Sequence, residues 1–261
     1  MTSFLEDQFG LKGAVAVVIG GSGVLGGSMA VALGRAGANV AVGFSGNADK
    51  AGNHARTITE SGGSAITVKT DAGSESGLRK ALAKVLETWG KVDIVVNAPG
   101  VNSPTPVFDI PDEEWSKIID TNLRGVFYSC RVFGKQMIGQ KTGGSIINIS
   151  SVSSELPLSR VFTYSISKAG VNNMTRFLAR EWAPHGVRVN AIMPGFFPAE
   201  QNRKILTEER RNMIFGHTPM GRYGEPHELS GALLWLASRN ASSFVTGAII
   251  PVDGGFTSMT I

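Results

Sequence analysis

The sequence AVAVVIGGSGVLGG at residues 14–27 decides the fold. Its first six residues are a continuous apolar run, which is typical of a parallel strand covered on both faces. A glycine-rich turn follows, the next nine residues have the composition of a helix closed by Gly37, and a second apolar run begins at Val40. A strand, a glycine-rich turn, a helix and a strand within about 30 residues form the βαβ unit in which a dinucleotide binds.

The glycine-rich turn itself fits the pattern G-x-G-x-x-G at residues 21–26. Glycines at such a turn let the backbone approach a pyrophosphate, and the following helix N-terminus supplies N–H groups and positive potential. A tight turn without a ligand has the same composition, so the flanking strand and helix favour the nucleotide interpretation. The expected contacts from the turn are Gly20, Ser22, Gly23, Leu25 and Gly26.

Strands and helices alternate to the end of the chain. Apolar runs predict six further strands, at residues 40–43, 65–69, 92–96, 145–149, 187–192 and 248–252. Helical patterns separate most of them, which predicts an α/β fold: a Rossmann-type, doubly wound, seven-stranded parallel sheet with helices on both faces. No linker, repeat or low-complexity segment interrupts the pattern, so residues 1–261 are expected to form a single domain.

Composition and charge exclude several function classes. The net charge is +4 and no basic run is longer than three residues, which gives no case for a nucleic-acid partner. No apolar run approaches the roughly 20 residues of a membrane span, and the N-terminus lacks the basic region and apolar core of a signal peptide. Cys130 is a lone cysteine, and the four histidines form no ligand pattern, so we expect a cytoplasmic protein with no metal site.

Residues 151–168 carry the candidate catalytic groups. Ser151 ends an apolar run, while Tyr164 and Lys168 are four residues apart in a predicted helix and so share one face. A neighbouring ammonium favours the ionised phenol, so we expect Lys168 to lower the pKa of Tyr164 and Tyr164 to act as a general acid or base. A buried aromatic residue beside a solvated lysine is the plain alternative, which Tyr-x-x-x-Lys alone does not exclude.

The end of the second strand bears on cofactor choice. Residues 43–47 read GFSGN and contain no carboxylate, whereas an acid there would bind the adenosine 2′-hydroxyl of NAD. Ser45, Asn47 and Lys50 could instead donate hydrogen bonds to a 2′-phosphate. We therefore expect NADP(H) to be favoured and NAD(H) to be possible, because Asp49 lies just beyond and no arginine is present to clamp the phosphate.

Taken in order, these motifs resemble the short-chain dehydrogenase/reductase family over nearly the whole chain. The thirteen-residue step from Ser151 to Tyr164 is typical of that family. The further motifs that carry the resemblance are GGSGVLGG (20–27), Asp71, NAPG (97–100), Asn122, RVN (188–190), PG (194–195) and PVDGG (251–255). The sequence departs from the family pattern at Ile19, Val24, Ala98 with Pro99, and Ala199.

The resemblance implies an NAD(P)(H)-dependent oxidoreductase that interconverts a ketone and a secondary alcohol. Tyr164 would exchange a proton with the substrate oxygen, and Ser151 would hydrogen-bond that oxygen. Lys168 would bind the nicotinamide ribose, and Asn122 would organise a water molecule in a proton relay. The cofactor contacts implied outside the glycine-rich turn are Ser45, Asn47, Asp71, Ala72, Asn97, Gly100, Tyr164, Lys168, Pro194, Gly195 and Phe197. A homotetramer, paired through the long helices, is also implied.

One branch of the family is more similar still, the D-mannonate (fructuronate) oxidoreductases and related sugar-acid reductases. The shared stretches are VLGG (24–27), PLSRV (157–161), PGFF (194–197), EQNR (200–203), HTPMGR (217–222) and SFVTG (243–247). This branch implies a sugar acid or related polyhydroxy carbonyl as substrate, with residues 194–224 covering it. Candidate substrate contacts are Arg160, Arg203 or Arg222 for a carboxylate, and Gln201 and Asn202 for hydroxyls, although arginines are common on any surface.

Three other functions compete with this one. SISK (165–168) and KTG (141–143) match serine β-lactamase motifs, but their order is reversed and the parallel sheet disagrees. A 3-oxoacyl thioester reductase would share the catalytic set, and only the shape of the substrate entrance would distinguish it. A non-catalytic scaffold that senses the cofactor would need the fold alone. The intact set of Asn122, Ser151, Tyr164 and Lys168 favours an enzyme.

Overall fold

The computed structural model describes residues 3–198 and 207–259, which form a seven-stranded sheet. All neighbouring strands are parallel, in the order β3-β2-β1-β4-β5-β6-β7. The strands are β1 (Val15–Ile19), β2 (Asn39–Phe44), β3 (Ser64–Lys69), β4 (Ile94–Asn97), β5 (Gly144–Ile149), β6 (Val187–Pro194) and β7 (Ile249–Val252). The predicted fold class is confirmed, and every strand boundary lies within two residues of its prediction.

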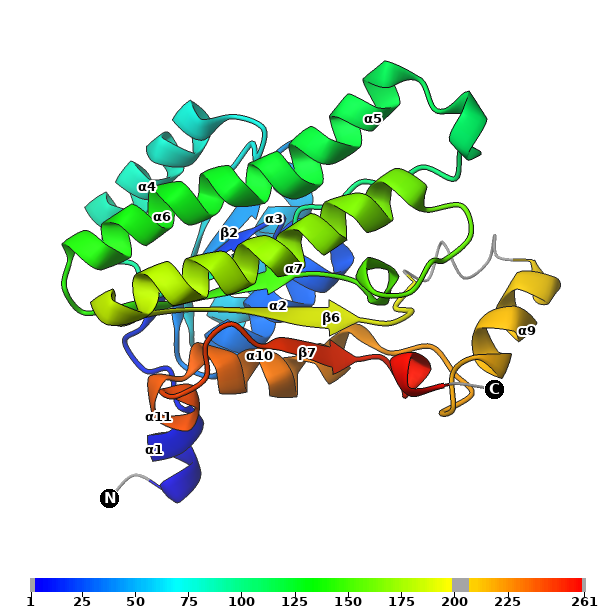
Figure 1. Ribbon diagram of the computed structural model, residues 1–261. Helices are drawn as coiled ribbons and strands as arrows, with labels where there is room; N and C mark the ends of the chain where they lie inside the picture. The colour runs from blue at the N-terminus through cyan, green and yellow to red at the C-terminus, as the bar shows by residue number, and fades with distance from the viewer. Residues whose placement is uncertain (1–2, 199–206, 260–261) are drawn as a thin grey trace.

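Helices cover both faces of this sheet (Figure 1). One face carries α4 (Glu75–Trp89), α6 (Gly125–Gly139) and α7 (Phe162–Trp182), and the other carries α2 (Val24–Arg35), α3 (Ala48–Glu60) and α10 (Ser230–Ala237). The shorter helices are α1 (Phe4–Phe9), α5 (Asp112–Ile119), α9 (Glu208–Gly216) and α11 (Arg239–Ser242). A π-helical turn, η2 (Asp120–Arg124), joins α5 to α6, and a 3₁₀ turn, η3 (Val152–Ser154), follows β5.

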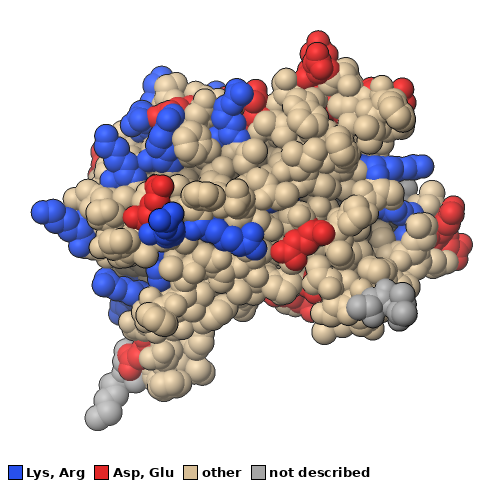
Figure 2. Space-filling model, in the orientation of Figure 1, with Lys and Arg blue, Asp and Glu red and all other residues tan. Residues whose placement is uncertain are grey.

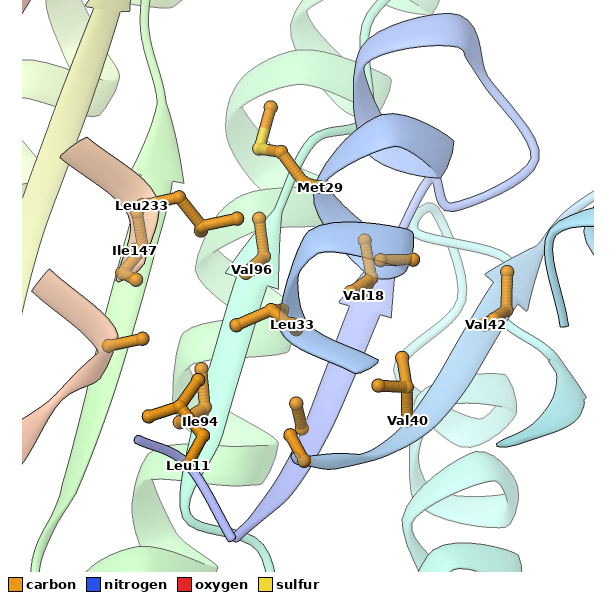
Figure 3. Packing of buried hydrophobic residues seen from close by; sticks show 14 of the residues in the cluster. Leu11, Val18, Met29, Leu33, Val40, Val42, Ile94, Val96, Ile147 and Leu233 are labelled. Atoms are coloured by element: carbon orange, nitrogen blue, oxygen red, sulfur yellow. The ribbon is translucent and has the colours of Figure 1, made fainter. Parts of the chain in front are cut away.

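Two hydrophobic cores lie against the two faces of the sheet. Successive strand residues point to opposite faces, so β1 contributes Ala16 and Val18 to one core and Val15, Val17 and Ile19 to the other. Figure 3 shows the first core, in which Met29 and Leu33 of α2 lie against strand residues such as Val18 and Val96. All five residues of β1 are buried, which explains why its sequence is apolar without alternation.

Helix α2 starts four residues earlier than the sequence predicts. The expected start was Ser28, but the helix begins at Val24 and includes Gly26 and Gly27. A Cβ at Gly26 would lie 2.3 Å from the Gly20 carbonyl oxygen, and one at Gly27 would lie 2.1 Å from Nε2 of His54. These two glycines therefore allow close packing of a helix, whereas the sequence suggested that they belong to a loop.

The strand topology determines where a ligand can bind. All seven strands are parallel, so their carboxyl ends meet at one edge, and in Figure 1 β6 and β7 point toward α9 there, away from α1 and α11. The chain runs from β1 out to β3 and then crosses to β4 on the other side of β1. Ligands of doubly wound sheets bind in the crevice at such a reversal. The glycine-rich turn after β1 and the segment after β4 border this crevice.

Surface charge is unevenly distributed on the face that Figure 2 shows. Lysine and arginine gather mainly on the half that carries the C-terminal parts of α6 and α7, where Arg131, Lys135 and Arg180 are exposed. This half lies away from the carboxyl edge of the sheet (Figures 1 and 2). An anionic ligand at that edge must therefore be recognised by local groups. In the described part of the chain, no helix combines the length and the apolarity needed to cross a membrane.

Candidate active site

The glycine-rich turn is packed directly against the segment that follows β4. Gly20 has a φ of +77°, in the left-handed region that favours glycine. A Cβ at this position would lie 2.6 Å from the carbonyl oxygen of Ala98, so a side chain is excluded by space as well as by conformation. The next residues are also fixed, because the Ser22 N–H donates to the Gly43 carbonyl at the end of β2 (3.1 Å).

The N-terminus of α2 is open to an anionic ligand. Its N-cap residue is Gly23, and the described residues provide no side-chain cap, whereas Asn47 caps α3 and Ser74 caps α4. The first N–H groups of a helix have no partner within the helix, and the helix dipole places positive potential there. These N–H groups fit the pyrophosphate of a dinucleotide.

The chain after β2 is exposed and contains no acid. Ser45, Gly46 and Asn47 are exposed, and the Asn47 Oδ1 accepts the Lys50 N–H (2.9 Å) as the cap of α3, so its amide NH₂ can still donate. A Cβ at Gly46 would have no heavy atom within 4 Å, so this position has room for a side chain. The first acid along the chain is Asp49, in the first turn of α3.

The chain after β3 forms a small turn at the same edge. The Asp71 side chain is exposed and accepts the Gly73 N–H (3.0 Å), while Ala72 is buried. A Cβ at Gly125, at the start of α6, would lie 2.8 Å from the Ala72 Cβ, so Ala72 packs tightly against α6. Of the two predicted contacts Asp71 and Ala72, only Asp71 therefore has a side chain available to a ligand.

Asn97 ends β4 and turns its side chain into the core. It is fully buried, and its Nδ2 donates to the Asn148 Oδ1 (2.9 Å) and lies 3.4 Å from the Cys130 Sγ. These partners belong to β5 and α6, so the side chain lies in the core and only the backbone of Asn97 can reach a cofactor. Burial raises the pKa of Cys130 to about 12, which agrees with its predicted place in the core.

Lys168 is buried between the ends of β4 and β5. Its Nζ donates to the carbonyl oxygens of Ile149 (2.8 Å) and Pro99 (3.4 Å) and lies 5.6 Å from the centroid of the Tyr164 ring. A Cβ at Gly100 would lie 4.0 Å from the same nitrogen, so the glycine leaves space above the amine. Burial disfavours the ammonium and lowers the pKa of Lys168 to about 8.

The hydroxyls of Ser151 and Tyr164 meet next to this amine. The Ser151 Oγ accepts hydrogen bonds from the backbone N–H (3.2 Å) and the hydroxyl (3.0 Å) of Ser153, which orient it at the start of η3. Burial raises the pKa of Tyr164, and its side-chain hydrogen bond with Ser151 opposes that rise. The expected lowering of the Tyr164 pKa by Lys168 is not found.

Asn122 lies in the π-helical turn and connects three segments. Its Oδ1 accepts the Val101 N–H (2.9 Å), and its Nδ2 donates to the Val101 carbonyl (2.9 Å) and to the Ser167 Oγ (3.2 Å). The side chain therefore fastens the segment after β4 to α7, one residue before Lys168. π-Helical turns are frequent at functional sites. The role of Asn122 in organising a water molecule stays a prediction.

The chain beyond β6 borders a cavity of about 380 Å³ at the same edge of the sheet. Pro194 ends β6, and the Gly195 N–H donates to the Val252 carbonyl (3.0 Å). The ring of Phe197 packs against Gly224, where an added Cβ would lie 2.3 Å from the nearest ring carbon. The cavity lining is formed by Phe196, Phe197, Thr218, Met220, Arg222, Gly224, Glu228 and residues 251–255. None of these described residues belongs to the catalytic set.

The candidate substrate residues have different surroundings in the structure. Arg222 forms a two-point ion pair with Glu228 (2.8 and 2.7 Å), which lowers the pKa of that carboxyl to about 2, so Arg222 already has a carboxylate partner. Arg160 is exposed, with a left-handed φ of 62°. The predicted Gln201, Asn202 and Arg203, and Ala199, lie outside the described residues.

The sequence analysis missed one arginine. The Arg210 side chain, on α9, donates to the Ser159 Oγ (2.7 Å) in the segment before α7. No motif or periodicity relates two residues that are 51 positions apart, so only the structure could pair them. Within the described ranges, no group of three or more His, Cys, Asp and Glu side chains could bind a metal ion.

Comparison with known proteins identifies the family. The family model described as enoyl-(acyl carrier protein) reductase matches residues 22–257, which is most of the chain. The chain belongs to the short-chain dehydrogenase/reductase family. As a member of that family it is an oxidoreductase that uses a nicotinamide cofactor.

Similar short-chain dehydrogenases/reductases match the chain from end to end. The uncharacterised oxidoreductase UxuB of Bacillus subtilis (strain 168) is 38% identical, over 94% of this chain and 95% of that protein. A gluconate 5-dehydrogenase from Burkholderia cenocepacia J2315, solved with NADP and tartrate, superposes with a TM-score of 0.92 at 33% identity, covering 98% of this chain and 99% of its own. A provisionally assigned D-mannonate oxidoreductase from Haemophilus influenza, solved with bound NAD, superposes with a TM-score of 0.91 at 33% identity. The match covers 98% of this chain and 99% of that chain.

Proposed function

We propose that this short-chain dehydrogenase/reductase interconverts a ketone and a secondary alcohol, with Tyr164 as the general acid and base. The observation that carries this proposal is the buried Lys168 amine, which donates to the Ile149 carbonyl two residues before Ser151 and lies 5.6 Å from the centroid of the Tyr164 ring. A scaffold that only senses the cofactor would not need two hydroxyls and an amine buried together.

In the direction of reduction, Tyr164 donates its proton to the substrate oxygen while Ser151 hydrogen-bonds the same oxygen. The raised pKa of Tyr164 means that this proton is present at neutral pH. A bound nicotinamide supplies or accepts the hydride. In the direction of oxidation Tyr164 must receive the alcohol proton, and the proposed part of Lys168, whose Nζ lies 5.6 Å from the centroid of the Tyr164 ring, is to bind the nicotinamide ribose. Asn122 keeps Val101 and Ser167 in place around Lys168.

The proposed cofactor is NADP(H), with NAD(H) as the weaker ligand. Support comes from the exposed Ser45 and Asn47 at the end of β2, which can donate to a 2′-phosphate, and from the absence of a carboxylate in residues 44–47. The two solved relatives contain NADP in one case and NAD in the other, so both cofactors are compatible with this fold. Predicted adenosine and nicotinamide contacts at Asp71, Gly100 and Gly195 lie at the same edge of the sheet.

Fluorescence titration of both cofactors tests this preference. We expect tighter binding of NADPH than of NADH, and Asn47→Asp should reduce or reverse the difference, because aspartate can still cap α3 but adds a negative charge. Asn53→Asp, on the exposed surface of α3, is the matched control for added charge. Tighter binding of NADH by the unmodified protein would contradict the proposal.

The proposed substrate is a sugar acid or a related polyhydroxy carbonyl, covered by residues 194–224. The names of the two solved relatives, a gluconate dehydrogenase and a mannonate oxidoreductase, support this class at 33% identity. The described part of the covering segment contains α9 and lines the 380 Å³ cavity through Thr218 and Met220.

A spectrophotometric screen tests the reaction and the substrate together. Purified protein is assayed with both cofactors against sugar acids, their neutral alditols and an acetoacetyl thioester. The highest kcat/KM is expected for a sugar acid. Turnover of the thioester alone would favour the 3-oxoacyl reductase, and a protein that binds cofactor but turns over nothing in the panel would favour the sensing scaffold.

Self-association is a further part of the proposal. Several large apolar side chains are exposed on the helices of one face, where a homotetramer would bury them: Trp115 (38%), Phe127 (38%), Phe162 (45%) and Phe177 (55%). Phe177→Lys should shift the species measured by light scattering toward smaller particles, and an unchanged mass would contradict the assembly. The cytoplasmic location remains a prediction.

A further inference from the structure

The contact between Arg210 and Ser159 joins two segments on either side of the catalytic stretch. Arg210 lies in the first turn of α9, where its backbone N–H is capped by the Thr207 hydroxyl (3.2 Å). Ser159 lies in the segment that begins after η3 and ends at α7. The catalytic Ser151 immediately precedes η3, and Tyr164 is the third residue of α7. The guanidinium of Arg210 therefore meets the short segment that links the two catalytic hydroxyls.

The guanidinium of Arg210 has unused hydrogen-bonding capacity. Its contact with the neutral Ser159 hydroxyl uses one of five N–H donors, and among the described residues no carboxylate pairs with it. Neighbouring arginines are different, because Arg211 pairs with Glu208 on its own helix and Arg222 pairs with Glu228. A partly buried arginine with one neutral partner can still bind an anion in the two-point geometry that carboxylates accept.

The acids near Arg210 do not neutralise it. Glu208 is one helical turn from Arg211 and pairs with it, and Glu209 is exposed on the position before Arg210. Glu155, in the opposite segment, is also exposed. The side chain that does meet Arg210, Ser159, is a hydroxyl that accepts from the guanidinium and has its own proton to donate.

We propose that Arg210 and Ser159 form the subsite for the carboxylate of the substrate. This inference rests on the proposed function as a sugar-acid oxidoreductase, and it moves the carboxylate contact from the predicted Arg160, Arg203 and Arg222 to Arg210. The carboxylate accepts hydrogen bonds from the Arg210 fork and from the Ser159 hydroxyl. The hydroxylated carbon chain of the substrate then extends along the segment toward Ser151 and Tyr164.

The test compares a sugar acid with its own amide. D-Gluconate and D-gluconamide, or D-mannonate and its amide, have the same hydroxyls and differ in charge at one end. For Arg210→Gln we expect KM for the acid to rise about 10- to 100-fold with kcat little changed, and KM for the amide to stay within about twofold. Arg210→Lys keeps the charge without the fork and should give an intermediate KM. Arg211→Gln, which removes an exposed arginine from the same helix, is the matched control.

Ser159→Ala provides an independent variant if Arg210→Gln does not fold, which its thermal unfolding midpoint would reveal. Its expected effect is a rise of about three- to tenfold in KM for the acid alone. Equal losses for acid and amide in either variant would mean that the contact only fastens α9, and the inference would be wrong. The unmodified protein separates this failure from failure of the proposed function: turnover of neutral substrates only would contradict both, whereas sugar-acid turnover that is insensitive to Arg210 would contradict the subsite alone.

Discussion

The catalytic floor and the substrate rim of this site are built in different ways. The catalytic floor is the name used here for the proposed catalytic residues Asn122, Ser151, Tyr164 and Lys168, and the substrate rim for the residues considered as partners of a substrate carboxylate, Ser159, Arg160, Arg210 and Arg222. Asn122, Ser151 and Lys168 each make two or more hydrogen bonds to groups fixed by the sheet or its helices. Arg160 and Arg222 are exposed, and within the described residues the Arg210 guanidinium hydrogen-bonds to one side chain, the Ser159 hydroxyl.

This contrast separates the residues proposed for the chemical step from the residues proposed to discriminate among substrates. A change in the floor removes contacts that every substrate needs, so it should reduce turnover or stability for all of them. A change in the rim removes a contact that only some substrates make. The following predictions test that separation, beginning with the largest expected effect.

Tyr164→Phe should reduce kcat by about 10²- to 10⁴-fold for every substrate, because it removes the only proposed proton donor and keeps the ring. The dissociation constant for the cofactor, measured by fluorescence, should stay unchanged. Tyr128→Phe, on the half-buried side of α6, is the control and should retain activity. Near-full activity of Tyr164→Phe would contradict the catalytic assignment.

Lys168 should make stability depend on pH. Its pKa is lowered from 10.5 to about 8 in the folded protein, so between these values the unfolded chain binds more protons and folding becomes more favourable as pH rises. Relative to Lys168→Met, the free energy of unfolding of the unmodified protein should rise by about 3 kcal/mol between pH 8 and pH 10.5. Chemical denaturation at several pH values measures it, and a difference that is independent of pH would show that the amine is not desolvated.

Asn122→Ala should lower the free energy of unfolding by about 2 kcal/mol, because it leaves the N–H and C=O of Val101 without their partner. Ser129→Ala is a matched control on the adjoining helix. The Ser129 hydroxyl is buried without a partner among the described residues, so its removal should be neutral or stabilising. If Asn122→Ala and Ser129→Ala lowered the free energy of unfolding equally, the loss in Asn122→Ala could not be attributed to its bonds with Val101.

Arg222→Gln should have the smallest effect, with kcat and KM for a sugar acid within about twofold of the unmodified protein. Its guanidinium is exposed and already paired with Glu228, so it is not available to a substrate carboxylate. Steady-state kinetics decide this. A rise in KM for the acid as large as that expected for Arg210→Gln would show that the Glu228 pair opens when substrate binds.

The fold was largely predictable because its signals are local. The strands β1 and β5 are buried on both faces, so their sequences are continuous apolar runs that can be recognised directly. The predicted start of α2 was wrong because the sequence does not distinguish a glycine that allows close helix packing from a glycine that forms a turn. Gly27, which packs against His54, is of the first kind.

The catalytic floor could be predicted as a set, but not the way in which its members are fixed. Ser151, Tyr164 and Lys168 were proposed from their spacing, and Asn122 from the family resemblance. Asn122 binds the backbone of Val101, and Asn97 turns into the core toward Asn148. Both contacts join segments that are far apart in the sequence, so motif spacing does not predict them. The rim was predicted least well, since the partners of Arg210 and Arg222 follow from the path of the chain after β6 and have no periodic pattern.

The two ends of the nucleotide site differ in how freely they can be altered. Gly20 has neither the conformation nor the space for a side chain, whereas a Cβ at Gly46 would meet no other atom within 4 Å. A protein engineer who wishes to change cofactor preference can therefore build a library at residues 45–47 and leave the glycine-rich turn intact.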